Sequence, residues 1–201
     1  MNKYNSLQEK FWSGKFGSSY TLRNQNPDKK NTILKDIIKN KLKITSVIEI
    51  GSNTGLNLDV IKSYYKKIKT VGIEINKDAY AILKTKHFAI NASALDLKVK
   101  NNYDLVISSG FLIHQNPKTL NKIYKTIYRL SNKYIYLREY FNPEPVMIKY
   151  RNNKNVLFKR DFAVELWKLF PNLKLVDYGF HWKHDPKYKK SDSNNYFIFK
   201  K

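Results

Sequence analysis

The most informative segment of this chain is Val47-Ile48-Glu49-Ile50-Gly51-Ser52-Asn53-Thr54-Gly55. An apolar run that carries an acid is followed there by a loop with two glycines, and a helical pattern begins where the loop ends. Glycine at position 51 permits a tight turn, and glycine at position 55 allows the backbone to approach a ligand closely. The segment therefore predicts a strand, a ligand-binding loop and a helix in succession.

A second acid stands at the end of the next predicted strand. Glu74 closes the run Val71-Gly72-Ile73-Glu74, nineteen residues after Gly55. An acid at this distance from a glycine loop is placed to accept hydrogen bonds from ribose hydroxyls. The two features together imply a cofactor that contains adenosine. The alternative is a purely structural strand, turn and helix whose acids are incidental.

The spacing of the glycines narrows the choice of cofactor. A dinucleotide site needs the pattern G-x-G-x-x-G, but Asn53 and Leu56 occupy the second and fifth positions after Gly51. A phosphate loop of the form G-x-x-x-x-G-K-[ST] is also missing. The remaining pattern, E-x-G-x-x-x-G with a ribose acid, resembles the donor site of the class I, Rossmann-like methyltransferases. That resemblance implies S-adenosyl-L-methionine as the cofactor, S-adenosyl-L-homocysteine as its product, and no metal.

The same resemblance implies a set of cofactor-binding residues. Glu49 and the backbone of residues 51–55 would hold the methionine end, and Glu74 the ribose. The residues after the third strand, Asn91-Ala92-Ser93, would border the adenine. The complete set is Glu49, Gly51, Ser52, Asn53, Gly55, Glu74, Ile75, Ala92, Ser93 and Ser109.

Short apolar runs alternate with helical patterns along most of the chain, and together they predict the fold. Runs rich in Val and Ile, typical of buried parallel strands, occur at 46–50, 70–75 and 103–108, with further strands expected at 133–138, 173–180 and 195–200. Helices are expected at 29–42, 55–65, 77–84, 117–130 and 160–170. This alternation predicts a doubly wound α/β fold, a mostly parallel twisted sheet of about seven strands with helices on both faces.

We expect a single methyltransferase domain over residues 1–201. Residues 1–28 mix aromatics with Gly and Ser, which indicates an ordered cap. Residues 1–44 would thus form an N-terminal helical cap and the first helix. Residues 45–201 would form the Rossmann-like core, with an insertion on the substrate side around residues 139–160.

Two side chains are candidates for proton removal from an acceptor. His114 follows the fourth strand, and the carboxyl ends of strands border the ligand crevice in an open α/β sheet. A histidine also has an ordinary pKa that suits a base at neutral pH. Glu139, at the end of the fifth strand, could position a substrate hydroxyl or amine. A structural, hydrogen-bonded histidine is the alternative for His114.

The sequence also excludes several reactions. It contains no cysteine, which removes thiolate zinc sites, iron–sulfur clusters and pyrimidine C5 methylation through a cysteine nucleophile. The fourth strand ends in Ser108-Ser109-Gly110-Phe111 rather than in the D/N-P-P-Y/F motif of enzymes that methylate the amino group of adenine. His181 and His184 lie close together without a third ligand, so we expect no metal site.

Several segments together resemble a narrower group, the pseudaminic acid biosynthesis-associated methylases, over nearly the whole chain. The resemblance is carried by residues 11–24 in the cap, 110–117 after the fourth strand, 139–143 with 150–151, and 158–163 with 177–182. It implies methyl transfer connected with surface nonulosonic sugars or their nucleotide-linked precursors. The expected partner is therefore a small molecule, an anionic or nucleotide-linked sugar.

An acidic or nucleotide-linked sugar would suit arginines and aromatic side chains around the acceptor. The expected substrate-binding residues are Tyr20, Arg23, Asn24, Tyr140, Arg151, Arg160 and Trp182. Each has a plainer alternative. Arg151 and Arg160 could pair with Asp161 or Glu165 on the surface, and Trp182 could serve packing.

The charge balance leaves other functions open. The chain has 38 Lys and Arg against 16 Asp and Glu, a net charge of +22, which favours polyanionic partners. An RNA methyltransferase that uses Lys183–Lys190 is therefore the first alternative, and a non-catalytic cofactor-binding module the second. Only five of the 38 are Arg, although nucleic-acid recognition relies on Arg, so compositional drift explains the charge equally well.

The sequence also predicts where the protein resides. No apolar run approaches the roughly 20 residues that span a bilayer. The first residues, MNKYNSLQEKFW, lack the continuous apolar stretch of a secretory signal. We expect a cytoplasmic protein without a membrane span.

Overall fold

The computed structural model describes residues 6–24, 31–186 and 192–201 of the chain. Seven strands form one sheet in the order β3-β2-β1-β4-β5-β9-β8. All neighbours from β3 to β5 pair in parallel, and β9 runs antiparallel to both β5 and β8. The predicted sheet of about seven mostly parallel strands is confirmed. Its strands are β1 Ser46–Ile50, β2 Lys69–Ile73, β3 Phe88–Ile90, β4 Tyr103–Ser109, β5 Ser131–Glu139, β8 Lys174–His181 and β9 Asn194–Lys200.

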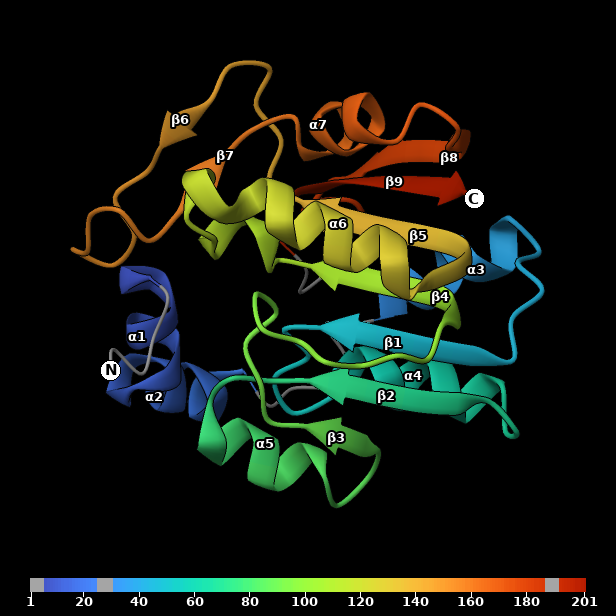
Figure 1. Cartoon of the computed structure of the whole chain (residues 1–201), viewed down its shortest axis with the longest axis horizontal. Helices are drawn as coiled ribbons and strands as arrows, with labels where there is room; N and C mark the ends of the chain where they lie inside the picture. The colour runs from blue at the N-terminus through green and yellow to red at the C-terminus, as the bar shows by residue number, and fades with distance from the viewer. Residues whose placement is uncertain (1–5, 25–30, 187–191) are drawn as a thin grey trace.

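Helices cover both faces of this sheet (Figure 1). Side chains of α3 (Asn31–Lys39), α4 (Leu56–Tyr64) and α5 (Lys77–Leu83) join one buried apolar cluster or contribute to its edge. Side chains of α6 (Leu120–Leu130) and α7 (Phe162–Leu169) join the other. The central strands are therefore buried on both sides, which is why they are nearly continuous runs of Val, Ile and Leu.

Several helix and strand boundaries differ from those that the sequence predicts. The start of the first predicted helix, residues 29 and 30, lies outside the described residues. The helix expected from Pro117 begins as a 3₁₀ turn, Pro117–Thr119, and continues as α6. The second strand ends at Ile73, so Glu74 and Ile75 follow it in the loop. The expected insertion around 139–160 contains a small hairpin of β6 (Val146–Met147) and β7 (Phe158–Lys159).

Two short helices form the cap that the N-terminal sequence predicts. They are α1 (Leu7–Ser13) and α2 (Lys15–Arg23). Figure 1 shows both at the edge where the arrowheads of β1 and β2 point, so the cap lies at the carboxyl ends of the parallel strands. In an open α/β sheet this edge is where ligands bind. Among the described residues, no helix combines the length and apolarity needed to cross a membrane.

Candidate active site

The loop after β1 adopts the backbone geometry that its glycines predict. Gly51 has φ +69° and Gly55 has φ +82°, both in the left-handed region that favours glycine. The amides of Gly51 and Ser52 both donate to Ile73 O, at 2.9 and 3.0 Å. The loop is therefore fixed to the end of β2.

The role expected of Gly55 needs a correction. A Cβ at this position would lie 2.7 Å from Leu83 Cδ1 and 2.8 Å from His87 Cδ2. Gly55 thus permits a close approach to neighbouring protein side chains, and it does not line the cavity described next. The tight turn expected of Gly51 is present, and a Cβ there would overlap the ring of Phe111.

A cavity of about 1070 Å³, counting the open solvent at its mouth, lies between the cap and the carboxyl ends of the strands. Apart from Gly55, every residue of the expected cofactor set lines it. These are Glu49, Gly51, Ser52, Asn53, Glu74, Ile75, Ala92, Ser93 and Ser109.

Glu74 is held at the cavity wall by backbone hydrogen bonds. It is 8% exposed, and its carboxylate accepts from Asn76 N at 2.7 Å and from Asn53 N at 2.8 Å. Burial raises the pKa of Glu74, and these hydrogen bonds oppose that rise. Each carboxylate oxygen keeps a lone pair for a further donor, which fits an acceptor of hydroxyl hydrogen bonds.

Glu49 occupies the other side of the loop. It is 1% exposed and accepts a hydrogen bond from the side-chain amide of Asn57, on α4. Both residues line the cavity. This arrangement places a carboxylate where a cationic group of a ligand could be bound.

The end of β3 is tied to the loop after β2 and to the cap. Asn91 Nδ2 donates to Glu74 O at 2.8 Å and to Ile75 O at 3.2 Å. The hydroxyl of Ser93 donates to Glu9 of α1. Ala92 and Ser93 therefore form the cavity wall on the side that the sequence assigns to adenine.

Several buried polar atoms around the cavity lack hydrogen-bond partners among the described residues. They are Gln8 Oε1, Trp12 Nε1, Asn57 Oδ1 and Ser109 Oγ, and all four residues line the cavity. A buried polar group without a partner is costly. These atoms indicate that the cavity is built for a polar ligand, which would supply the missing partners.

His114 is fixed in one orientation at the cavity wall. Its Nδ1 lies 2.7 Å from Val156 O, and because a carbonyl can only accept, Nδ1 must carry the proton. The ring packs against Trp12 of the cap, with 4.3 Å between centroids. Burial lowers the pKa of His114 to about 4. The imidazole is therefore neutral at pH 7, with its lone pair on Nε2.

Glu139, the second expected catalytic residue, lies behind the cavity wall. Its Oε1 accepts from Ser108 Oγ at 2.7 Å, Leu112 N at 3.1 Å and Phe111 N at 3.2 Å. Ser108 belongs to the end of β4, Leu112 to the 3₁₀ turn Leu112–His114, and Phe111 is the residue just before that turn. The structure thus places Glu139 as a positioning group for the turn that carries His114.

The buried carboxyl of Glu139 predicts a stability that depends on pH. Burial raises the pKa of Glu139 to about 7, so the folded protein holds this proton more tightly than the unfolded chain does. The resulting contribution to stability is complete below the ordinary pKa of a glutamate and is lost as the pH rises through 7. We expect the free energy of unfolding to fall by roughly 3 kcal/mol on this account. Glu139→Gln, which does not titrate, should lack that contribution. Urea unfolding of both proteins at pH 5 and pH 8 measures the difference, and equal pH dependence would refute it.

The expected substrate-binding residues divide into two groups. Tyr20 and Asn24 line the cavity, whereas Arg23, Tyr140, Arg151, Arg160 and Trp182 do not. Arg160 forms the ion pair with Glu165 that the sequence left open, with 2.7 Å between Nη2 and Oε1. Trp182 is 53% exposed, with its ring against His184.

The remaining members of the second group have local partners or lie in turns. The guanidinium of Arg23 lies 5.8 Å from the ring centroid of Phe16. Arg151 is exposed in a turn with φ +45°. Tyr140 is hydrogen-bonded to Asp192. The sequence patterns that suggested these residues do not distinguish ligand contacts from such local interactions.

The structure adds cap residues that sequence reasoning did not assign to a site. Gln8, Glu9 and Trp12 line the cavity, as does Asn76. Asn76 holds the cap in place, because its Nδ2 donates to Trp12 O at 3.1 Å and to Ser18 Oγ at 3.2 Å. The dense aromatic content of the cap was the one available signal for this role.

The close contact between the cap helices predicts the effect of a small substitution. A Cβ at Gly17 would overlap Trp12 O and lie 2.9 Å from Asn76 Nδ2. Gly17→Ala should therefore separate α2 from its neighbours and lower the free energy of unfolding by roughly 1–3 kcal/mol. Thermal unfolding measures this, with Ser19→Ala at an exposed position of the same helix as the control. Identical melting temperatures for both variants would argue against this packing.

Within the described ranges, no group of three or more His, Cys, Asp or Glu side chains is arranged to hold a metal ion.

Comparisons with known proteins agree with this geometry. A family model described as a methyltransferase domain matches residues 48–133. No curated protein sequence matches the chain significantly. Among solved structures, the chain is similar to 1,6-didemethyltoxoflavin-N1-methyltransferase from Burkholderia thailandensis, solved with 1,6-didemethyltoxoflavin and S-adenosylhomocysteine. The TM-score is 0.70 at 12% identity, over 97% of this chain and 87% of that one.

Two further solved structures show the same fold. Magnesium protoporphyrin IX methyltransferase from Synechocystis PCC 6803, with bound S-adenosylmethionine, has a TM-score of 0.68 at 11% identity, with full coverage of both chains. The plantazolicin methyltransferase BpumL, in complex with a pentazolic desmethylPZN analogue and S-adenosylhomocysteine, has a TM-score of 0.64 at 13% identity. That match covers 96% of this chain and 94% of the other.

Proposed function

We propose that this chain is a class I, S-adenosylmethionine-dependent methyltransferase, in which the capped cavity binds the methyl donor and the methyl group passes to a small molecule. The match to a methyltransferase domain over residues 48–133 and the shared fold support this proposal. The observation that carries the proposal is the arrangement of the cavity wall. The glycine loop, the acid after β2 and the residues after β3 line one continuous cavity with the cap and His114.

The cavity residues fit the donor chemically. Glu74 would accept the ribose hydroxyls, and Ala92 with Ser93 would border the adenine. Glu49 would bind the ammonium group of the methionine end. The unpartnered side-chain oxygen of Asn57 would accept a hydrogen bond from the same polar end. When bound, the sulfonium of the donor supplies an electrophilic methyl group.

The residues of this chain would then align the acceptor and remove its proton. Enclosure by the cap restricts the orientation of two bound reactants, and such alignment contributes strongly to catalysis of bimolecular transfer. His114 Nε2 is the unprotonated nitrogen at the cavity wall, and it would accept the proton from an acceptor hydroxyl or amine. Glu139 would keep the 3₁₀ turn, and with it His114, in position.

For the acceptor we propose a nonulosonic, pseudaminic-type sugar or its nucleotide-linked precursor. The enclosed position of the cavity under α1 and α2 favours a small molecule over a polymer. The resemblance of the cap and of residues 139–143 to pseudaminic acid-associated methylases supports the sugar. The net charge of +22 is the observation that favours RNA as the second candidate.

Transfer of labelled methyl from S-adenosylmethionine into an extract of the source organism tests the proposal. The extract is divided, one half is treated with nuclease, and small metabolites are separated from RNA. We expect label in nuclease-resistant small molecules. Label that disappears with nuclease would establish the RNA alternative, and donor binding without any transfer would indicate a non-catalytic module. Extract incubated with the labelled donor but without added protein provides the background.

A further inference from the structure

A buried cation lies beside the cavity. Arg138, on β5, is 6% exposed, and its Nη1 donates to the hydroxyl of Thr32 on α3. Its Nε has no hydrogen-bond partner among the described residues. None of the ion pairs within the described ranges includes Arg138.

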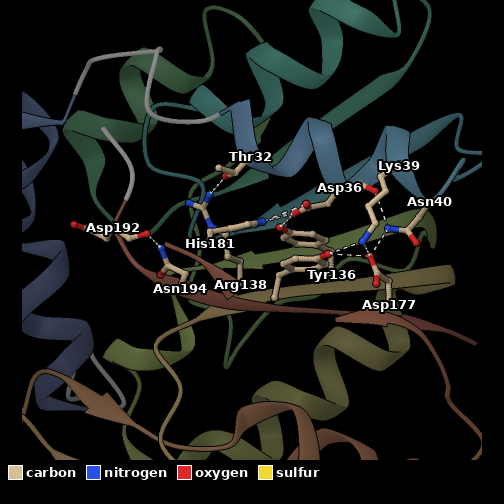
Figure 2. A network of polar contacts seen from close by, with 11 residues as sticks. Thr32, Asp36, Lys39, Asn40, Tyr136, Arg138, Asp177, His181, Asp192 and Asn194 are labelled. Carbon is tan, nitrogen blue, oxygen red and sulfur yellow. Dashed lines mark hydrogen bonds and ion pairs between the residues drawn. The ribbon is translucent and has the colours of Figure 1, made fainter. Parts of the chain in front are cut away.

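The acids near Arg138 are bound to other groups. Figure 2 shows Arg138 joined to Thr32, whereas Asp36 and Asp177 are bonded to other side chains. Asp36 accepts from the hydroxyl of Tyr136 at 2.6 Å and lies 3.2 Å from His181 Nε2. Asp192 is hydrogen-bonded to Tyr140. Burying a charge without a bonded counterion costs free energy. A bound anion next to Arg138 would offset that cost.

The sheet register places Arg138 next to the cavity wall. Arg138 pairs with Ser109 across the parallel strands β5 and β4, and paired residues project from the same face of a sheet at a spacing of about 4.8 Å. Ser109 lines the cavity, and its hydroxyl is buried without a partner. Burial raises the pKa of Tyr20, another cavity residue, to about 12, and the positive charges of Arg138 and Arg151 oppose that rise.

The strand order places this pair on the acceptor side. The proposed donor contacts lie at the ends of β1, β2 and β3, whereas Arg138 lies on β5, beyond β4. The loop amides of Gly51, Ser52 and Asn53 already donate to the end of β2. Arg138 therefore lies three strands away from β2, the strand that Glu74 follows.

We propose that Arg138, together with the hydroxyl of Ser109, binds a carboxylate or phosphate of the acceptor that is not the methylated atom. The inference rests on the proposed function and narrows its substrate class to anions. A guanidinium fork with an adjacent hydroxyl matches the geometry of an oxyanion.

The first test measures the charge of the labelled product. Small-molecule product from the extract assay is applied to an anion-exchange resin at pH 7. Retention of the label supports the inference. Label in a small molecule that passes through the resin overturns it while leaving the proposed function intact. Label confined to RNA, or no label at all, would contradict the proposed function. It would therefore also overturn this inference, which rests on that function.

The second test compares Arg138→Met and Arg138→Lys with the control Arg129→Met, an exposed arginine on α6. Initial rates are measured over a dilution series of the extract. Arg138→Met should raise the apparent KM for the acceptor at least 30-fold, with a smaller change in kcat. Arg138→Lys should restore part of the loss, and Arg129→Met should behave as wild type. An unchanged KM in Arg138→Met would overturn the proposal.

A third measurement tests whether Arg138 binds the acceptor or instead the methionine carboxylate of the donor. S-adenosylhomocysteine and 5′-methylthioadenosine, which lacks the amino-acid end, are titrated into each variant. We expect the dissociation constants of both compounds to change less than twofold in each variant. A tenfold loss for S-adenosylhomocysteine alone would assign Arg138 to the donor. If Arg138→Met does not fold, Ser109→Ala removes a hydroxyl that bonds no described residue, and its acceptor KM should rise about fivefold; no rise would overturn the proposal.

Discussion

Replacing Glu74 by alanine is expected to weaken the binding of S-adenosylhomocysteine roughly 100-fold. The carboxylate is held at the cavity wall by Asn53 N and Asn76 N at 2.8 and 2.7 Å, so it is positioned before a ligand arrives. Two hydrogen bonds from ribose hydroxyls to a charged acceptor would together contribute about 3 kcal/mol. Calorimetric titration of wild type and variant measures the loss directly.

Two further variants make this result interpretable. Glu74→Gln keeps one acceptor oxygen and should lose about tenfold in affinity. Asp78→Asn removes an exposed carboxylate in the first turn of α5 and should bind as wild type does. Urea unfolding of each variant reports any damage to the loop. Wild-type affinity in a folded Glu74→Ala protein would contradict the ribose assignment.

The second large effect is expected at His114. His114→Asn should lower kcat by roughly 10²- to 10⁴-fold, the usual contribution of a positioned acid or base. Asparagine can still donate to Val156 O but supplies no basic nitrogen. Burial lowers the pKa of His114 to about 4, so wild-type activity should decline through this group only as the pH falls toward 4. The rate of label transfer at saturating donor, measured from pH 4.5 to 8, tests both statements.

An exposed histidine provides a control for the loss of an imidazole away from the cavity. His184→Asn changes an exposed side chain after β8 and should leave kcat unchanged. His114→Asn should bind S-adenosylhomocysteine within about twofold of wild type, because the proposed donor contacts lie on other residues. Activity retained by His114→Asn would make this histidine structural, which is the alternative that the sequence left open.

The cavity wall that we propose binds the donor could be predicted from the sequence, because local rules determine it. Apolar runs buried on both faces must be inner strands, and the order of strands and helices brings their carboxyl ends to one edge. Gly51, with φ +69°, is a position where the backbone itself requires glycine. Glu49 and Glu74 are then placed at that edge by their position at or just after the strand ends.

The wall that we propose faces the acceptor depends on contacts between distant segments, which no local pattern encodes. Trp12 reaches His114 because Asn76 holds the cap against the core. Glu139 lies behind the cavity because three backbone amides of the segment after β4 donate hydrogen bonds to its carboxylate. Arg160 meets Glu165 through an ion pair that the sequence could suggest but not decide.

A crystal structure of the chain with S-adenosylhomocysteine would show whether the capped cavity is the donor site. We expect the ligand under α1 and α2, with its ribose hydroxyls within hydrogen-bond distance of the Glu74 carboxylate and its adenine beside Ala92 and Ser93. A ligand bound elsewhere, or a cavity that stays empty at saturating S-adenosylhomocysteine, would contradict this expectation.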